Sequence, residues 1–441
     1  MSAIDSLFQA ALGLTNPWFV KASRLTDSPT FGKSSAPGGM VLELEIDFNP
    51  GARLPCPDCG CACPSHDTSE LTWRHLNFWQ HASFLRARVP RVKCPDHGVK
   101  QVTVPWARAG SGFTLLFEAM TLALAKHMPM SSIAAHVGEH DTRLWRILRH
   151  YVAKAYDAAT WSEMTTLGVD ETSARKGHRY VTVVVDVDSP QVQRHGPRLI
   201  YMTPGRKAES LAEFVQEMPR HAATPEQIKL AALDMGRAFI SGVSEYLPNA
   251  KICLDRYHVM QLVGKAIDEE RRYLQSLGCD LKGALWALRG NEENLKEKHR
   301  ELRRTLCKEH TELARCMALR DHLQAMWSYE EETGPVLPGA VRRTARQRAA
   351  EHLQKWCGWA QRSRLASFVR LARTLREHTQ AILNYYPSHL TSAAVEAING
   401  LIQTAKRRAK GYRNFENLRA IAYWVAGKLD INVVTPMPTT P

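Results

Sequence analysis

The sequence lacks any hydrophobic run long enough to cross a membrane. A membrane-spanning helix needs about 20 consecutive apolar residues, and no stretch approaches that length. The segment from Met1 to Val20 also lacks the basic start and unbroken apolar core of a secretory signal. No repeat of fixed period is present. These absences argue against membrane, secreted and repeat proteins, so we expect a cytoplasmic protein with no membrane partner.

Acidic residues are few relative to basic ones. The 441 residues include 58 Lys and Arg but 44 Asp and Glu, which gives a net charge of +14. Such an excess favours a polyanionic partner, above all nucleic acid, although a merely basic protein remains the alternative. The length corresponds to roughly three domains. We therefore expect a multidomain, nucleoid-associated protein.

Cysteines are concentrated in one short segment. Cys56 and Cys59 form one Cys-x-x-Cys turn, and Cys94 and His97 form a second turn after a β-type stretch. Paired turns of this kind predict one tetrahedral zinc ion, which would hold a small β unit together or support DNA contact. Two further thiols, Cys61 and Cys63, leave the ligand set open. Four nearby basic residues favour the DNA alternative: Arg86, Arg88, Arg91 and Lys93.

The next segment has the outline of a helix-turn-helix. Residues 113–128 show helical periodicity, 131–138 form a short helix that Gly138 would end, and Asp141 can cap a third helix over 142–155. This last helix carries arginines three residues apart, and they predict a side that contacts DNA: Arg143, Arg146 and Arg149. The alternative is a solvated helix face, where this spacing is also found.

Five strand-like runs follow, and several end in an acid. The first three come in succession and the last two alternate with helical segments, which predicts a mixed sheet covered by helices. Ligands collect beyond the carboxyl ends of strands in open α/β sheets, so Asp170, Asp234 and also Asp255 are candidates for one metal-binding edge.

Residues 261–383 are almost continuously helical in composition, with a break near Gly334. This block predicts a large helical insertion. We expect its tryptophans to pack helices together and not to stack on bases; they are Trp286, Trp327, Trp356 and Trp359.

A helix is then expected from about Thr391. Its apolar stripe would comprise Leu390, Ala394, Ile398, Leu401 and Ala405, which leaves Glu396 on the polar side and available to a metal. The alternative is that Glu396 only complements the helix dipole. A basic stretch follows, in which a glycine and aromatic residues lie between the basic ones. Its basic side chains are suited to phosphate contact: Lys406, Arg407, Arg408, Lys410 and Arg413.

The order of these parts resembles the bacterial insertion-sequence transposases of the ISL-three type. The matching pieces cover most of the chain from about residue 50, including the cysteine turns, Gly168 to Glu171, Asp234 with Met235, Asp255 to His258, and Glu396 to Asn399. His97 stands where the family commonly has cysteine, and Ala397 where it commonly has glycine.

This resemblance implies a ribonuclease-H-like catalytic domain with a triad of Asp170, Asp234 and Glu396. Three carboxylates suit two Mg²⁺ (or Mn²⁺) ions acting on DNA phosphates. Asp255 is the rival third ligand, and Glu171 and Asp186 are weaker rivals. His258 would orient a phosphate or simply pack.

The expected function is binding of transposon ends and target DNA, followed by cleavage and strand transfer, by a homodimer or higher oligomer. A nuclease without strand transfer and a non-catalytic regulator are the alternatives. The expected fold is multidomain α+β. Its parts are an N-terminal segment and linker (1–45), a zinc-binding module (46–107), a helix-turn-helix (108–160), the first catalytic part (161–260), a helical insertion (261–388), the returning helix with its basic segment (389–430) and a tail (431–441).

Overall fold

The computed structural model describes residues 2–32, 39–175, 177, 179–331 and 343–431. The chain divides into two compact units, one made of residues 1–159 and 401–441 and the other of residues 160–400. No helix among the described residues is both long and apolar enough to cross a lipid bilayer. The expected break near Gly334 and most of the expected tail lie outside the described residues.

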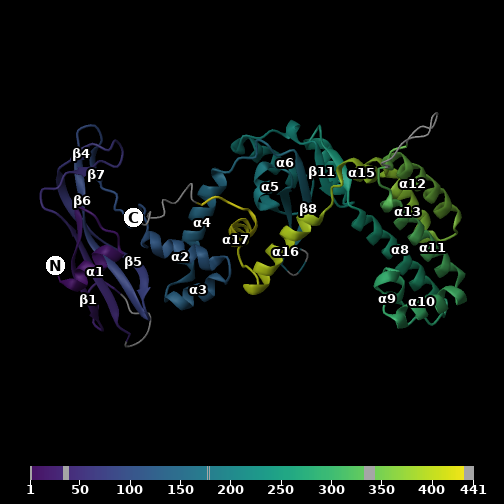
Figure 1. Ribbon diagram of the computed structural model, residues 1–441, viewed down its shortest axis with the longest axis horizontal. Coiled ribbons are helices and arrows are strands. Elements are labelled where there is room, and N and C mark those ends of the chain that lie inside the picture. Colours follow the sequence, from purple (N-terminus) through teal and green to yellow (C-terminus); the bar gives the residue numbers. More distant parts are fainter. Residues whose placement is uncertain (1, 33–38, 176, 178, 332–342, 432–441) are drawn as a thin grey trace. The chain divides into compact units, whose positions relative to one another are not determined.

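The first unit begins with a five-stranded sheet in which β1, β2, β6 and β5 are neighbours in that order and β7 pairs with β6 (Figure 1). Three tryptophans, Trp18, Trp73 and Trp106, meet edge to face in its core. The elements are α1 (Ala3–Ala11), β1 (Trp18–Thr26), β2 (Val41–Phe48), β3 (Leu54–Pro55), β4 (Ala62–Cys63), β5 (Ser65–Phe78), β6 (His81–Cys94) and β7 (Gly98–Gln101).

The N-terminal residues differ from the expected segment and linker. Strand β1 pairs antiparallel with β2 along its length, from Trp18 opposite Phe48 to Thr26 opposite Val41. The buried side chains of Trp18 and Val20 join the same core as those of β2 and β6. Residues 18–26 therefore form an integral strand of the module that we expected to begin at residue 46.

Four helices complete the first unit: α2 (Leu115–Ala125), α3 (Met130–Val137), α4 (Asp141–Asp157) and α17 (Phe415–Ala426). Gly138 ends α3 in the left-handed conformation, as expected, whereas His140 and not Asp141 caps α4. Glu118 is fully buried between α2 and α4 and accepts hydrogen bonds from Arg108, Ser111 and Tyr151. Helix α17 also contacts α2, because the Trp424 indole donates a hydrogen bond to the Leu122 carbonyl at 3.1 Å.

The second unit contains a mixed sheet in the order β10, β9, β8, β11, β12. Strands β8, β9 and β10 are antiparallel neighbours, whereas β11 runs parallel to both β8 and β12. This arrangement agrees with the mixed α/β sheet expected from the sequence. The elements are β8 (Thr166–Arg175), β9 (Arg179–Asp186), α5 (Pro190–His195), β10 (Arg198–Pro204), α6 (Glu209–Glu217), β11 (Leu230–Leu233), α7 (Arg237–Tyr246) and β12 (Lys251–Leu254).

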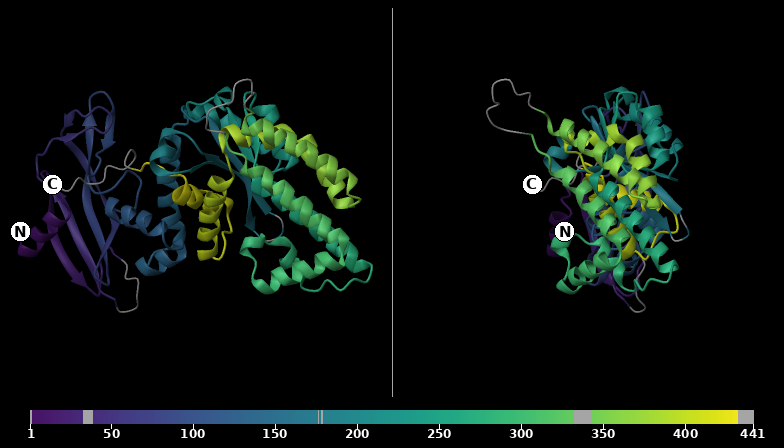
Figure 2. Two further views of the ribbon diagram at one scale, coloured as in Figure 1. Left: turned by 45° about the vertical axis from the view of Figure 1, so that its right-hand side comes forward. Right: turned by 90° about the vertical axis from the view of Figure 1, so that its right-hand side faces the viewer.

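Between β12 and α16 the described residues contain helices and no strand, and these helices lie alongside one another (Figure 2). Trp356 is fully buried there and donates to the Leu319 carbonyl at 2.7 Å, as a packing residue would. Trp286 is 67% exposed, so the expectation that it packs helices was wrong. The helices are α8 (Arg256–Ser276), α9 (Ala284–Arg289), α10 (Glu297–Glu309), α11 (Thr311–Ala325), α12 (Ala345–Arg362), α13 (Ala366–Glu377), α14 (Thr379–Leu383) and α15 (Tyr385–Ser388).

Helix α16 (Ala393–Arg408) begins in this unit and lies against β8 (Figure 1). The apolar stripe expected for it was partly wrong, because Leu401 is 43% exposed while Val395 and Ile402 are buried. The close approach to β8 explains the difference. A Cβ at Gly168 would lie only 2.2 Å from Val395 Cγ2, so the missing side chain of a glycine makes room for Val395.

We predict that Gly168→Ala destabilises the protein by about 1–3 kcal/mol, because Val395 is stiff and buried and has no room to move aside. The matched control is Gly400→Ala in the same helix, where an added Cβ meets open space. That change should stabilise the helix by up to about 1 kcal/mol. Denaturant unfolding of both variants measures the difference, and equal midpoints would show that Gly168 is not required for the contact.

Candidate functional site

The two cysteine turns of the first unit come together in space. Cys56, Cys59, Cys94 and His97 place one ligand atom each within 4.8 Å of one another. The Cys59 and Cys94 sulfurs are 3.6 Å apart, and His97 Nδ1 lies 3.5 Å from the Cys94 sulfur. Sulfur ligands on a tetrahedral zinc would be about 3.8 Å apart, so this donor set fits zinc.

The two remaining thiols of that segment lie outside this group. Cys61 is exposed, and its backbone carbonyl accepts a hydrogen bond from the Cys56 amide. Cys63 is buried, and its thiol contacts the Cys61 carbonyl at 3.4 Å. The four ligand atoms that the structure brings together are therefore those of the paired turns.

Asp170, Asp234 and Asp255 lie on neighbouring strands of the second unit or directly after them. In the parallel register, Ala232 of β11 lies opposite Gly168 of β8. Asp234 and Asp170 each follow two residues later, so they come next to each other. Asp234 directly follows β11, whereas Asp170 lies in the middle of β8, opposite Val183 of β9, so the expectation that Asp170 ends its strand was wrong. Leu233 lies opposite Leu254 of β12, which brings Asp255 into the same row.

The surroundings of Asp170 shift its pKa upward. Burial raises its pKa to about 6, and the adjacent charge of Asp234 adds to this shift. The hydrogen bond from the Glu171 amide, at 2.7 Å, and the nearby His258 act in the opposite direction. Two carboxylates that repel each other in a partly dry site form an environment that favours a cation.

Helix α16 contributes two polar residues to this region. Asn399 donates from Nδ2 to Asp170 Oδ2 at 2.8 Å, and its own Oδ1 is buried without a partner among the described residues. Glu396 lies one turn earlier on the same side of the helix, is exposed, and accepts a hydrogen bond from the Ser392 hydroxyl at 2.9 Å. Sequence reasoning did not foresee the Asn399 contact, although its spacing of three residues from Glu396 was the available signal.

The three expected triad carboxylates are not packed as tightly as the cysteine cluster. Among the described residues, Asp170, Asp234 and Glu396 do not bring their oxygens within 4.8 Å of one another. Asp170 and Asp234 are adjacent, whereas Glu396 stands near them through the contacts of its helix with β8.

The rival acids are occupied in structural contacts. The carboxylate of Asp255 is 4% exposed and accepts from the Tyr257 amide at 2.5 Å and from the Ser392 amide. Glu171 pairs with Arg206 at 3.5 Å. Asp186 is fully buried, pairs with Arg198 at 2.8 Å, and lies opposite Leu167 at the other end of β8. These contacts give each rival acid a structural role.

The arginines of α4 differ in their surroundings. Arg143 pairs with Glu139 and lies over the Phe113 ring at 4.4 Å. Arg149 donates to Asn417 of α17 at 2.7 Å. Arg146 is exposed and has no charged partner among the described residues, so it is the arginine most available to DNA.

The basic residues of the β5–β6 hairpin are mostly paired with acids. Arg86 contacts Glu45 at 2.6 Å, Arg88 contacts Asp47 at 2.9 Å, and Arg91 pairs with Asp67. These pairs weaken the argument for DNA contact that we based on the charge of this hairpin. They are the cross-strand ion pairs of a sheet surface.

The basic stretch after α16 is largely exposed. Arg407, Arg408, Lys410 and Arg413 all face solvent. Arg408 also contacts the His127 carbonyl at 3.4 Å, which holds it near the C-terminal end of α2. Lys406 is partly covered, and burial lowers its pKa.

Comparisons with known proteins agree with this geometry. A family model described as "Transposase" matches residues 167–422, one for the "Helix-turn-helix domain of transposase family ISL3" matches 102–152, and one for the "zinc-finger of transposase IS204/IS1001/IS1096/IS1165" matches 53–97. The chain is 28% identical over 451 residues to a transposase for insertion sequence element IS1557 of Mycobacterium tuberculosis, with 94% of each chain covered. It is 27% identical over 392 residues to a transposase for IS1001 of Bordetella parapertussis, covering 85% of this chain and 89% of that one.

The motifs that suggested the resemblance lie within these matched regions, and the expectation they raised is confirmed. Because the first family model spans more than half of the sequence, the chain belongs to the ISL3 family of transposases.

Proposed function

We propose that this transposase binds the two ends of an insertion sequence and catalyses DNA cleavage and strand transfer at Asp170, Asp234 and Glu396. The observation that carries the proposal is the row of acids on neighbouring strands beside α16, where Val395 fills the space over Gly168 and Asn399 holds Asp170. The sheet order, with three antiparallel strands followed by two parallel ones, supports a ribonuclease-H-like fold interrupted by the helices between β12 and α16. Since an insertion sequence has two DNA ends, we expect the protein to act as a homodimer or higher oligomer on DNA.

The donor set suits two Mg²⁺ or Mn²⁺ ions better than one. Oxygen ligands of a single Mg²⁺ lie about 2.1 Å from it, whereas two ions stand about 3.5–4 Å apart, so the outer ligands of a pair spread over about 8 Å. Asp170, Asp234 and Glu396 come from β8, from the end of β11 and from α16, and we expect them to hold such a pair between them. When bound, such ions activate the attacking oxygen and stabilise the leaving oxygen of an in-line displacement at phosphorus.

The remaining residues of the site orient these carboxylates. Asn399 and the Glu171 amide each hold one oxygen of Asp170, and the Gly236 amide holds Asp234 Oδ1 at 2.8 Å. Asp255 fastens the starts of α8 and α16 through their backbone amides. We assign Asp255 this positioning role and Glu396 the role of third ligand.

DNA binding is assigned to two regions of the first unit. In the helix-turn-helix, Arg146 would read base edges, while Arg143 and Arg149 join it through contacts that also hold the fold. The basic stretch from Lys406 to Arg413 would bind backbone phosphates. One structural zinc at Cys56, Cys59, Cys94 and His97 would fix the β unit beside them.

Purified protein should contain about one zinc per chain, and Cys94→Ser should lose it together with the folded state of the β unit, because binding of a structural zinc is coupled to folding. Cys61→Ser is the matched control, since that thiol lies in the same loop but outside the cluster. Elemental analysis gives the stoichiometry. Zinc retained in Cys94→Ser, or lost in Cys61→Ser, would refute this ligand set.

Asp170→Asn, Asp234→Asn and Glu396→Gln should each abolish cleavage and strand transfer while leaving end binding intact, because each keeps the shape but removes a charged ligand. In the native protein Mg²⁺ should stabilise the fold, by about 2.7 kcal/mol at 100 times its dissociation constant, and Asp170→Asn should lose this effect. A strand-transfer assay with a pre-cut end, run beside thermal unfolding, measures both.

Glu209→Gln, an exposed acid at the start of α6, is the neutral control for these variants. Asp255→Asn should mainly lower stability, by about 1–3 kcal/mol, because one backbone amide loses its acceptor. If Glu396→Gln kept near-normal strand transfer while Asp255→Asn was folded but inactive, Asp255 and not Glu396 would be the third ligand. Cleavage without any strand transfer in the native protein would favour a nuclease.

Arg146→Ala and Arg407→Ala should weaken DNA binding in different ways. Loss of a base contact at Arg146 should cost about 1–3 kcal/mol on terminal DNA and little on random DNA. Loss of a phosphate contact at Arg407 should weaken both equally and reduce the slope of log affinity against log salt by about 0.9. Titrations of terminal and random duplexes over a salt series separate the two, and equal losses on both duplexes for Arg146→Ala would contradict base readout.

A further inference from the structure

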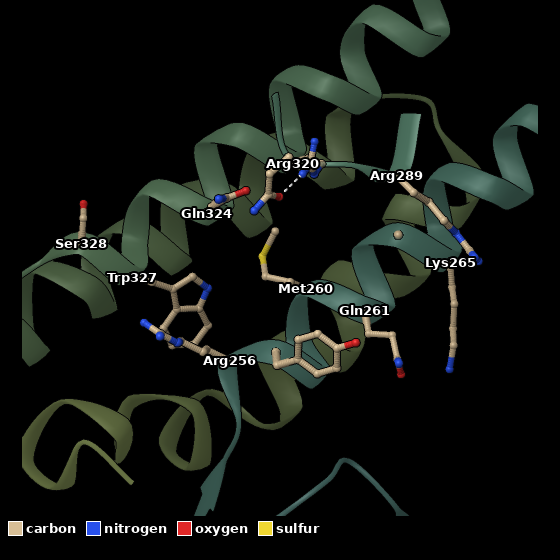
Figure 3. A pocket seen from close by; sticks show the side chains of 12 residues that line it. Arg256, Met260, Gln261, Lys265, Arg289, Arg320, Gln324, Trp327 and Ser328 are labelled. Atoms are coloured by element: carbon tan, nitrogen blue, oxygen red, sulfur yellow. Dashed lines mark hydrogen bonds between the residues drawn. The ribbon is translucent and has the colours of Figure 1, made fainter. Parts of the chain in front are cut away.

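A groove of about 990 Å³ lies among the helices of the second unit (Figure 3). One side is formed by the start of α8, with Arg256, Tyr257 and Lys265. The other side is formed by Arg289 of α9, Arg320 of α11 and Trp327 of the turn after α11. None of these residues belongs to the carboxylate site described above.

The lining is strongly cationic. It contains four basic side chains and no carboxylate. In the part of the chain that the structure describes, Arg256, Lys265 and Arg289 have no acidic partner within ion-pair distance, and all three are exposed. Some other arginines of this unit differ, for example Arg271 and Arg272, which both pair with Asp268. The groove therefore offers unneutralised positive charge to an anion.

Arg320 makes this a built site and not only a charged surface. It is 5% exposed, donates to Asn291 Oδ1, and has its nearest described carboxylate, Asp321, at 3.9 Å. Arg303 is also buried nearby and donates to the Ala287 carbonyl at 2.7 Å. Burial lowers the pKa of Arg320, and the charge of Arg303 adds to the shift, whereas Asp321 and Glu292 act in the opposite direction. A bound anion would relieve this excess of buried positive charge.

Aromatic rings stand beside these cations. Tyr257 is 61% exposed, and Trp327 stacks on Tyr386 with its indole N–H buried and without a partner among the described residues. Proteins that bind single-stranded nucleic acid combine two features: basic side chains along the phosphate backbone, and aromatic rings on which the bases stack. The groove has the volume of a small-molecule site, about 300–1,000 Å³, so it suits unpaired nucleotides and is too small for a duplex.

The groove begins next to the carboxylate edge. Arg256 directly follows Asp255, which ends β12 in the same row as Asp234 and Asp170. The first cation of the groove is therefore one residue further along the chain than Asp255.

We propose that this groove binds unpaired nucleotides of the DNA strand that extends from the carboxylate site, with phosphates on Arg256, Lys265, Arg289 and Arg320 and a base on Tyr257. The proposal rests on the proposed function, because the acids define where the strand comes from. It adds a second contact that holds a frayed or cleaved end during the reaction.

The test uses the full-length protein in EDTA, so that no catalysis occurs, with a short fluorescein-labelled oligothymidylate as the single strand and a duplex of the same length for comparison. Lys265→Gln and Arg289→Gln should each reduce the salt slope for the single strand by about 0.7 and leave the slope for the duplex unchanged. Tyr257→Ser should weaken single-strand binding about tenfold, and Tyr257→Phe should not. Lys355→Gln, an exposed lysine of α12 outside the groove, is the matched control and should have no effect.

Photocrosslinking locates the contact independently of affinity. An oligonucleotide with 5-iodouracil should crosslink to peptides that contain Tyr257 or Trp327. Unchanged slopes in both charge variants, equal losses on single strand and duplex, or crosslinks confined to the first unit would each overturn the proposal.

The two proposals fail separately. If the groove variants bind the single strand normally while Asp170→Asn is inactive, only the groove assignment is wrong. If Asp170→Asn still cleaves DNA while the groove variants lose the single strand, only the catalytic assignment is wrong.

Discussion

The contact between Val395 of α16 and Gly168 of β8 is the constraint on which the candidate catalytic site depends. It joins residues separated by most of the second unit, and it requires a glycine because any side chain at 168 would overlap Val395. Asn399, one turn further along α16, then reaches Asp170. The helices between β12 and α16 take part in neither of these contacts, so they can form a separate group without displacing Glu396 from the sheet.

Three acids lie in or directly after neighbouring parallel strands, yet their surroundings separate their roles. Asp255 is buried and both of its oxygens accept backbone amides, which makes it part of the framework that starts α8 and α16. Asp170 is held by one amide and one side chain, and its raised pKa reflects a charge that burial and Asp234 leave uncompensated. A carboxylate whose charge is already satisfied gains little from a metal, whereas one that is destabilised gains much.

Local patterns in the sequence predicted the features that local chemistry determines. The cluster of three cysteines and one histidine follows from two short turns, Gly138 from the need for a left-handed residue, and the five strands from their apolar runs. The face of α16 could not be predicted in the same way. Both Val395 and Leu401 fit a helical stripe, and only the space over Gly168, far away in sequence, selects Val395. The exposure of Trp286 and the pairing of Arg86 with Glu45 are likewise settled by tertiary neighbours.

Net charge alone indicated a polyanionic partner, but it did not locate the contact surfaces. Many arginines are used internally: Arg74 is 2% exposed and donates to the Val137 carbonyl, and Arg198 forms a buried pair with Asp186. The hairpin arginines are neutralised by acids across the sheet. Cations without acidic partners among the described residues are those able to neutralise phosphates at little desolvation cost, because they give up no existing ion pair. Arg146, the exposed cations from Arg407 to Arg413 and the groove beside α8 meet that criterion, which connects the positive charge of the sequence to particular surfaces.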